Sequence, residues 1–330
     1  MANWGFLGAG SIAASSLAPA VHAADGPRLH AVAATDARRA RALDPARVYT
    51  RYQELLDDPD VDIVYVALHN SAHRPWVERA LRAGKHVLCE KPLGLTAAEV
   101  GAMTATARAT GRLLVEAAWN RWHPRTRDLE SMITRGAIGT VHTVTARFDG
   151  LAPAPGNYRL DPALGGGALY DVGYYAVAAA LAAFGWRSPG VVRAEQDHWH
   201  PGSADSATRF LLDFPGRGTA EIGCSLIGGM SETFTTTGTD GSLTLTPPAF
   251  CAGSAPSTLT TGTLSTDTLT PADDGRHRHY PPQDPYRLMV ESVDAAAHGD
   301  TAAHLVPLAQ SLLIAATLDS VRSRLARRAA

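Results

Sequence analysis

The chain has 330 residues, of which 45% are hydrophobic and 19% charged, a composition typical of a globular protein large enough for two domains. Its formal net charge of −2 gives no general attraction for nucleic acid or an anionic membrane, and no 18-residue apolar span or signal peptide is indicated. The three cysteines lack CxxC spacing, which argues against structural zinc and disulfides and favours a reducing compartment, so we expect a cytoplasmic protein.

The first 120 residues alternate short apolar runs with stretches of helical periodicity. This alternation predicts a parallel sheet wrapped by helices, a doubly wound dinucleotide-binding (Rossmann) domain. The predicted strands cover 3–7, 29–34, 61–68, 86–89 and 113–116. The predicted helices cover 11–24, 37–43, 52–56, 74–83 and 97–110.

Longer strand-like stretches mixed with helices follow, and they predict an α+β domain built on a large, mostly antiparallel open sheet. Strands are expected at 141–148, 208–214, 219–226 and 232–237, and helices at 128–135, 174–184, 288–298 and 306–327. We therefore place the domains at 1–122 and 123–330, with the last helix free to pack back on the first domain. The Ser- and Thr-rich segment 252–276 is expected to be a hairpin or a mobile loop.

A glycine turn, GAGSIA at 8–13, lies between the first predicted strand and the first predicted helix. In this context GxGxxG/A predicts a tight turn whose backbone N–H groups approach a pyrophosphate. Glycine turns at strand–helix junctions also occur without a ligand, so the motif alone leaves that alternative open. The cofactor-binding residues expected here are Gly8, Gly10, Ser11 and Ile12.

The end of the second predicted strand bears on the choice between NAD and NADP. An enzyme that prefers NAD usually places an acid there for the ribose 2′-OH, but Asp36 comes two residues after Ala34, where the strand should end. Thr35 with Arg38 or Arg39 could hold a 2′-phosphate, although paired arginines on a helix are more often solvated. The pattern slightly favours NADP over NAD.

Only two lysines stand among the thirty basic residues, and Lys91 directly follows a predicted buried strand, in Glu90-Lys91-Pro92. Lysine can act as a general acid or base once burial or a neighbouring cation lowers its pKa, whereas arginine is effectively always protonated. Scarcity alone does not identify a functional group, because the second lysine, Lys85, lies in an ordinary turn and is interpreted as incidental.

Several motifs carry a resemblance to a known family. The segments VYVALHNSAH at 64–73 and AGKHVLCEKP at 83–92 resemble the glucose-fructose oxidoreductase / inositol dehydrogenase (Gfo/Idh/MocA) family. EAAWNRWHP at 116–124, GAIG at 136–139 and GGGALYDVGYY at 165–175 agree with it. The resemblance runs from residue 3 to about 190 and implies an NAD(P)-dependent dehydrogenase or reductase acting on CH–OH or C=O.

The resemblance also implies roles for individual residues. Lys91 would lie beside the nicotinamide, Lys91-Pro92 can be a cis peptide, and Asp171 and Tyr175 would complete the catalytic set. Further residues on the cofactor side would be Leu68, Asn70, His73, Glu90, Lys91, Trp119 and Arg121. The substrate would be bound by Lys91, Arg121, Tyr158, Asp171 and Tyr175.

The spacing of Asp171 and Tyr175 supports a shared role independently, because residues four apart lie on one helix face. The alternative for Tyr175 is a core tyrosine with a satisfied hydroxyl. The three glycines at 165–167 are expected to permit close approach of the backbone to a ligand.

Two positions depart from the family pattern. Many members have histidine where this chain has Tyr175, so it resembles the tyrosine-type members, and a phenol slightly favours the reductive direction. His69 stands where proline is usual. His69 and His73 have the i,i+4 spacing of a metal pair, but no third ligand accompanies them and no metal site is predicted.

The function expected from these residues is hydride transfer between a nicotinamide and a carbinol or carbonyl carbon of a sugar or sugar derivative. The alternatives are an NDP-keto-sugar reductase of deoxysugar biosynthesis, a dihydrodiol or other non-sugar dehydrogenase, and a non-catalytic NAD(P)-binding regulator. The presence of Lys91, Asp171 and Tyr175 together argues against a regulator. The expected partners are a small-molecule substrate and further copies of the chain, as a homodimer or homotetramer formed through the C-terminal sheet, with no nucleic acid and no membrane.

Overall fold

The computed structural model describes residues 2–264 and 271–329, and the chain divides into two compact units. The first unit comprises Met1–Trp122 with Asp284–Leu312, and the second comprises His123–Gln283 with Leu313–Ala330. The division is therefore discontinuous in sequence. None of the helices within the described ranges combines the length and the apolar character that a membrane span requires.

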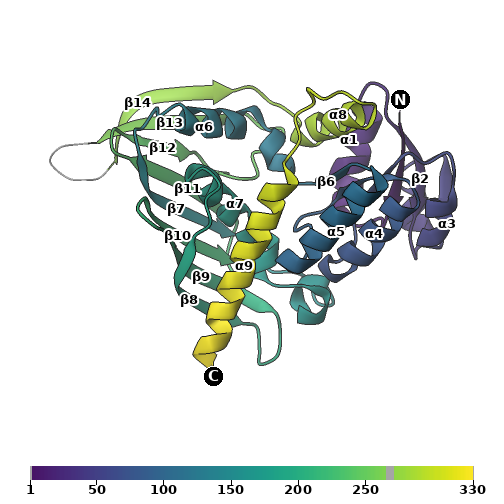
Figure 1. Cartoon of the computed structure of the whole chain (residues 1–330), viewed down its shortest axis with the longest axis horizontal. Helices are drawn as coiled ribbons and strands as arrows, with labels where there is room; N and C mark the ends of the chain where they lie inside the picture. Colours follow the sequence, from purple (N-terminus) through teal and green to yellow (C-terminus); the bar gives the residue numbers. More distant parts are fainter. Residues whose placement is uncertain (1, 265–270, 330) are drawn as a thin grey trace. The chain divides into compact units, whose positions relative to one another are not determined.

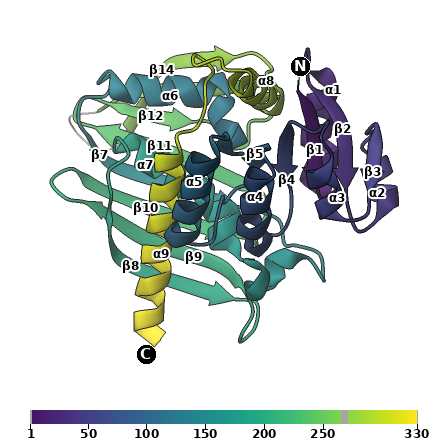
Figure 2. The same ribbon diagram turned by 45° about the vertical axis from the view of Figure 1, so that its right-hand side comes forward.

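A parallel six-stranded sheet forms the centre of the first unit, in the order β3-β2-β1-β4-β5-β6 (Figures 1 and 2). The strands are β1 (Asn3–Leu7), β2 (Arg28–Ala33), β3 (Arg47–Tyr49), β4 (Ile63–Val66), β5 (His86–Cys89) and β6 (Leu114–Glu116). The strand order reverses between β1 and β4, and the carboxyl ends of strands at such a reversal are where α/β sheets bind ligands. This confirms the predicted doubly wound sheet; the three-residue edge strand β3 is an addition to it.

The helices of the first unit are α1 (Ala18–Ala23), α2 (Ala37–Arg41), α3 (Tyr52–Asp57), α4 (His73–Arg82), α5 (Ala97–Thr110) and α8 (Pro285–Ala297). The sequence sets the ends of α5 clearly. The Thr96 hydroxyl accepts a hydrogen bond from the Glu99 N–H at the start, and Gly111 ends the helix in the left-handed conformation at φ 63°. For this reason the predicted limits of α5 coincide with the observed ones.

Lys85, which the sequence does not connect with function, has a structural role. Its Nζ donates to the carbonyl oxygens of Asp58 and Val61, both at 2.7 Å, and only 7% of the residue is exposed. Burial lowers the pKa of Lys85. These carbonyls precede β4, so the ammonium group fixes the loop at the amino end of that strand.

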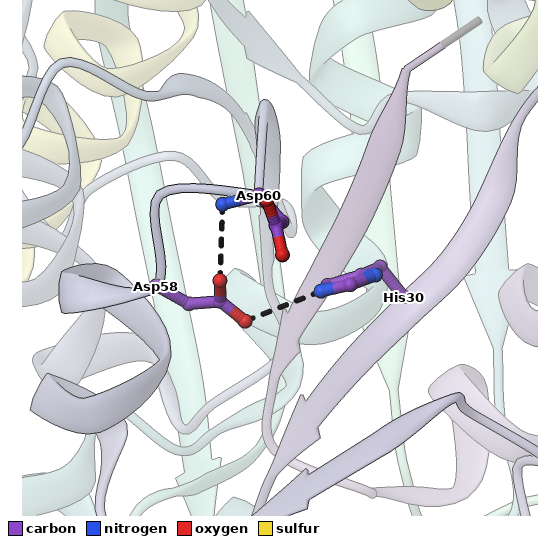
Figure 3. A group of neighbouring side chains, drawn as sticks. All are labelled: His30, Asp58 and Asp60. Atoms are coloured by element: carbon purple, nitrogen blue, oxygen red, sulfur yellow. Dashed lines mark hydrogen bonds and ion pairs between the residues drawn. The ribbon is translucent and has the colours of Figure 1, made fainter.

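Asp58 and Asp60 of the same loop form a cluster with His30 of β2 that has metal-ligand chemistry, and the ligand atoms lie within 4.8 Å of one another (Figure 3). Both carboxylates already pair with Arg47, which lies 3.0 Å from Asp58 and 3.0 Å from Asp60. The Tyr49 hydroxyl also donates to Asp58, at 2.9 Å. The cluster is an ion-pair network that stabilises β2, β3 and the loop before β4.

An eight-stranded, mostly antiparallel sheet forms the second unit, in the order β14-β13-β12-β11-β7-β10-β9-β8 (Figure 2). The strands are β7 (Val141–Asp149), β8 (Gly190–His198), β9 (Asp205–Phe214), β10 (Gly218–Ser225), β11 (Ser231–Gly238), β12 (Ser242–Leu245), β13 (Ser257–Leu264) and β14 (Pro271–Tyr280). Strands β7 and β10 pair in parallel. The antiparallel pair β13/β14 confirms the hairpin expected within 252–276, whose residues 265–270 lie outside the described ranges.

The helices of the second unit are α6 (Pro124–Thr134), α7 (Tyr174–Ala183) and the larger part of α9 (Leu308–Ala329). Alternation along β7 separates the two faces of the sheet: Val144, Ala146 and Phe148 are buried, whereas Thr145 and Arg147 are exposed. Helix α7 packs on β7 and β10 and covers the buried face. The opposite face is polar.

Helix α8 packs in the first unit, against α1 and the 3₁₀ turn η3 (Trp119–Trp122). The ring of Tyr286 stacks on Trp119 with centroids 4.8 Å apart. The Asp294 carboxylate accepts hydrogen bonds from the Ala2 N–H at 3.2 Å and the Trp4 indole at 3.4 Å. Residues near the end of the chain thus complete the unit that the first residues begin.

Candidate active site

The glycine turn follows β1 as expected. Gly8 has φ +98°, and a Cβ there would lie 3.1 Å from Leu68 Cδ2 and closer still to the Ala67 carbonyl, so only glycine fits. Its N–H donates to the Ala33 carbonyl at 2.8 Å, which means that Gly8 shapes the turn. At Gly10 the nearest atom would be 4.0 Å away, which leaves space for a ligand.

The exposed Ser11 and half-buried Ile12 begin the helical segment that follows. The first N–H groups of a helix have no acceptor within it and favour an anion such as a pyrophosphate. The glycine turn and the residues after it therefore fit a dinucleotide.

The turn after β2 brings together the residues expected to choose the cofactor. Thr35, Arg38 and Arg39 are all exposed there. The Asp36 carboxylate accepts the Arg38 N–H at 2.9 Å and so caps α2, and it pairs with the Arg38 guanidinium at 3.4 Å. Hydrogen bonding by the Arg38 side chain is the main cause that lowers the pKa of Asp36. The arrangement leaves Thr35 and Arg39 available to a 2′-phosphate.

Lys91 follows β5 in a turn that contains a cis Lys91-Pro92 peptide, as the resemblance allowed. Glu90 braces this turn, because one carboxylate oxygen accepts the Lys91 N–H at 3.2 Å and the other accepts the Tyr65 hydroxyl at 2.6 Å. The Glu116 carboxylate accepts the Leu93 N–H at 2.7 Å. Two buried or partly buried carboxylates thus fix the backbone that carries Lys91.

His73 also supports the turn that carries Lys91. The residue is 0% exposed, and its ring nitrogens lie 2.9 Å from the Pro92 carbonyl oxygen and 3.1 Å from that of Leu68. His73 therefore joins the two loops that carry these carbonyl groups, and its expected place on the cofactor side remains a prediction. Asn70 is also buried, at 3% exposed, and the His69 ring lies 3.0 Å from the Ser71 hydroxyl.

The junction residues Trp119 and Arg121 are packed inside the first unit, each 7% exposed. Trp119 stacks on Tyr286, and Arg121 Nη1 donates to Gln310 Oε1 at 2.7 Å. Their expected contacts with cofactor, and that of Arg121 with substrate, remain predictions.

In the second unit, Asp171 and Tyr175 occupy one continuous helical segment, since the π turn η6 (Leu169–Gly173) runs directly into α7. The ring of Tyr175 is 5% exposed and lies among aromatic side chains, with Phe148 at 5.5 Å and Phe250 at 6.4 Å between centroids. The Asp171 carboxylate accepts a hydrogen bond from Arg159 Nε at 2.7 Å. The structure therefore adds a guanidinium to the expected acid–phenol pair.

The glycines before Asp171 have a different role from the one expected. A Cβ on Gly166 would lie 2.5 Å from the Arg159 carbonyl oxygen, and the Gly167 N–H donates to that same oxygen at 2.9 Å. Gly167, at φ +115°, lies against the Asp205 carboxylate, which in turn accepts the Leu169 N–H at 2.9 Å. The backbone of Tyr158 and Arg159 occupies the space that Gly166 provides, and the Asp205 side chain occupies the space at Gly167.

Sequence reasoning missed Arg159, although one signal was present: it is the basic residue next to Tyr158, just before the glycine motif. Its guanidinium lies 4.9 Å from the centre of the half-buried Tyr158 ring. Burial acts to lower the pKa of Arg159, but the Asp171 carboxylate outweighs it and the net direction is upward. Arg159 and Asp171 therefore form a stable ion pair.

A buried loop positions Phe250 against Tyr175. Arg125 Nη2 donates to the carbonyls of Pro248 at 2.6 Å and Ala249 at 2.8 Å. The Glu232 carboxylate accepts the N–H groups of Phe250 at 2.6 Å and Cys251 at 2.7 Å. No short motif marks this loop, because its partners come from distant parts of the sequence.

Comparison with known proteins agrees with this geometry. The profile of an oxidoreductase family with an NAD-binding Rossmann fold matches residues 2–117, and that of the GFO/IDH/MocA C-terminal domain matches residues 126–244. The chain belongs to the GFO/IDH/MocA family. It is therefore an oxidoreductase with an NAD-binding domain, as the motifs predicted.

The relatives in this family include trans-1,2-dihydrobenzene-1,2-diol dehydrogenase of Oryctolagus cuniculus, 34% identical over 88% of each chain. The same enzyme from Homo sapiens is 36% identical over 67% of each chain.

Two solved structures of the GFO/IDH/MocA fold are also similar. The 3-ketoreductase KijD10 from Actinomadura kijaniata, in complex with NADP and TDP-benzene, is 26% identical and covers 98% of each chain with a TM-score of 0.85. The aldose-aldose oxidoreductase from Caulobacter crescentus is 25% identical, covers 100% of this chain and 98% of its own, and has a TM-score of 0.84.

Proposed function

We propose that the protein catalyses NADP-linked hydride transfer from a secondary carbinol carbon of a sugar or a related cyclic diol, or to the matching carbonyl carbon in the reverse direction. The observation that carries the proposal is the set formed by Asp171, Tyr175 and Arg159, which joins a phenol, a carboxylate and a hydrogen-bond donor on adjoining turns. The diol substrates named for the rabbit and human relatives, and the aldose named for the Caulobacter enzyme, support this substrate class.

The cofactor would be held at its pyrophosphate by Gly10, Ser11 and Ile12, and at its 2′-phosphate by Thr35, Arg38 and Arg39. The exposed guanidiniums favour NADP, and KijD10 was solved with NADP. When bound, the nicotinamide supplies or accepts the hydride.

In the reductive direction the proposed role of Tyr175 is to donate its hydroxyl proton to the carbonyl oxygen as the carbon gains the hydride. The ammonium of Lys91 would stabilise the developing alkoxide. Asp171, fixed by Arg159, would orient the substrate hydroxyl. In the oxidative direction the same groups would remove the hydroxyl proton.

The test uses Lys91→Met and Tyr175→Phe, with NADPH absorbance at about 340 nm as the assay. Removing a proton-transfer group typically costs roughly 10²–10⁴-fold in rate. We expect losses of this order in kcat/KM, with NADPH binding by fluorescence retained. Tyr174→Phe is the matched control, because it removes the same hydroxyl from the neighbouring ring and should keep activity. Turnover within a few-fold of wild type in both variants would contradict the proposed roles.

A second candidate is reduction of an NDP-keto-sugar, which the likeness to KijD10 favours. NADPH consumed in the presence of a TDP-keto-sugar, together with no turnover of any free sugar or diol, would favour the NDP-keto-sugar reductase. Binding of NADPH without turnover across both classes would favour the regulator.

We also propose that two or four copies associate through the polar face of the second unit's sheet, opposite α7. Along β7 this face presents Thr145 and Arg147, and Arg193 of β8 pairs with Glu221 of β10 at 3.5 Å, across the intervening strand β9. Charges of both signs on one face can complement the same face of a second copy. Within the described ranges none of the three cysteines forms a disulfide, which supports a cytoplasmic location.

A further inference from the structure

The guanidinium of Arg159 has one edge that the fold does not use. Its Nε donates to Asp171 Oδ2 at 2.7 Å, and its face lies on Tyr158 at 4.9 Å. Among the described residues, Nη1 and Nη2 have no hydrogen bond or ion pair. The side chain is 26% exposed, so part of it is open to solvent. A pair of N–H donors in a fixed fork therefore lies beside the candidate acid Asp171.

The backbone of Arg159 is held firmly, which separates it from a mobile surface arginine. Its N–H donates to the Asn157 side chain at 3.0 Å, and its carbonyl accepts the Gly167 N–H at 2.9 Å. Gly166 permits this close packing, because a Cβ there would clash with the same carbonyl. The fork is thus preorganised before any substrate arrives.

The net charge of the Arg159–Asp171 pair determines which chemical groups the Nη donors of Arg159 can bind. Asp171 neutralises Arg159, and the adjacent side chains of Tyr158 and Tyr175 are phenols. A neutral pair gives little net attraction for a phosphate or carboxylate, but its N–H groups still bind oxygen acceptors. Two neighbouring oxygens on one substrate, as in a vicinal diol or an α-hydroxy ketone, match a two-donor edge.

We infer that Arg159 is a substrate-binding residue whose Nη edge binds the oxygen on the carbon next to the reacting carbon. The preferred substrates are then vicinal diols and the matching α-hydroxy carbonyl compounds. The inference rests on the proposed function, and it adds the requirement for a second oxygen. A site built to bind a hydroxyl discriminates strongly against an analogue that lacks it.

The test compares each diol with its analogue lacking the neighbouring hydroxyl, using NADP-linked oxidation. The pairs are trans-cyclohexane-1,2-diol with cyclohexanol, and D-glucose with 2-deoxy-D-glucose. We expect wild type to prefer the compound with two oxygens. Arg159→Met should lower kcat/KM for both compounds, because Asp171 loses its partner, but the loss for the compound with two oxygens should exceed that for the analogue by about 10²-fold, which removes the preference.

Arg159→Lys keeps a positive charge for Asp171 but lacks the planar fork, so it should lose the preference while retaining more activity on the analogue than Arg159→Met does. This variant keeps the inference testable if Arg159→Met folds poorly. Arg287→Met is the matched control, because it removes another Nε–carboxylate pair, to Glu291 at 2.6 Å on α8, and should change neither substrate.

Three results would overturn the inference. Equal losses on both members of a pair would show that Arg159 only positions Asp171. A wild type that prefers the analogue would refute the second-oxygen requirement while leaving dehydrogenase activity in place. No turnover of any member, with NADPH bound, would refute the proposed function as well.

Discussion

The buried imidazole of His73 lies between two carbonyl oxygens, those of Leu68 and Pro92. A neutral ring can donate to only one of them, whereas a protonated ring could donate to both. Burial nevertheless lowers the pKa of His73 to about 4, and the nearby His69 and Lys91 act in the same direction. The neutral form therefore supports the Lys91 turn at physiological pH.

His73 should make stability depend on pH. Between its ordinary pKa of 6.5 and the folded value of about 4, the unfolded chain binds a proton that the native chain does not, so stability present above pH 6.5 is lost as the pH falls. The full loss is about 3 kcal/mol, of which about 2 kcal/mol falls between pH 6.5 and about 5. Urea unfolding at about pH 7.5 and pH 5 should show this loss in wild type and a correspondingly smaller one in His73→Gln.

His123, whose pKa burial also lowers to about 4, contributes equally in both proteins and so cancels in this comparison. An unchanged difference between the two pH values would show that His73 does not titrate in this way.

At the scale of single residues, functional groups that lie in short sequence motifs could be predicted. Groups whose role depends on contacts with distant residues could not. Lys91, Asp171 and Tyr175 could be named because each follows a recognisable strand or glycine run. Lys85 and Arg159 could not, because their partners are a loop 24 to 27 residues away and an acid 12 residues away in a turn of unknown shape.

Among the elements, prediction succeeded where an apolar pattern or a capping residue marks the segment and failed at exposed or short strands. Edge strand β8 lacks a clear alternation of apolar and polar residues, because most of its residues are exposed. Strands β3 and β12 have only three and four residues, which is too short for a recognisable pattern. The glycine run before Asp171 was noticed, but its contact with the Tyr158–Arg159 backbone depends on a fold of the chain that no local pattern specifies.

Gly166→Ala tests this contact. The added Cβ would meet the carbonyl oxygens of Arg159 at 2.5 Å and Tyr158 at 2.6 Å, so the backbone must shift. We expect a loss of about 1–3 kcal/mol in the free energy of unfolding, as for overpacked sites, together with a lower kcat/KM because Arg159 moves. Urea unfolding and the NADPH assay measure the two effects.

The matched change is Gly101→Ala in α5, where a Cβ meets nothing within 4 Å. It should stabilise the protein by roughly 0.4–1 kcal/mol. If Gly166→Ala behaves like Gly101→Ala, the glycine is not required for packing.

On the scale of the whole molecule, the sequence pattern changes near residue 121 from short apolar runs to longer strand-like stretches. This change predicted a parallel sheet followed by an antiparallel one, and both are present. The return of residues 284–312 to the first unit was not predictable from periodicity. The apolar side of α8 shows that the helix must pack, but it does not show against which partner.

Association through the polar sheet face predicts that Thr145→Lys separates the copies. Thr145 is exposed on β7, between β11 and β10 in the sheet, and a lysine there would add bulk and charge at a close contact. Sedimentation velocity should show an oligomer for wild type and a monomer for the variant. Gln53→Lys, an equal change of charge at an exposed position on α3, should leave the oligomer intact. A monomeric wild type would rule out the proposal.

The packing of α8 on α1 and η3 also has a consequence for biosynthesis. Domains generally fold as units while the chain is being made, amino-terminal domain first. Here the nucleotide-binding domain begins with the first strand but lacks its Tyr286 and Asp294 contacts until the last part of the chain has left the ribosome. The second unit's sheet, whose strands end at Tyr280, can therefore form before the domain that precedes it is complete.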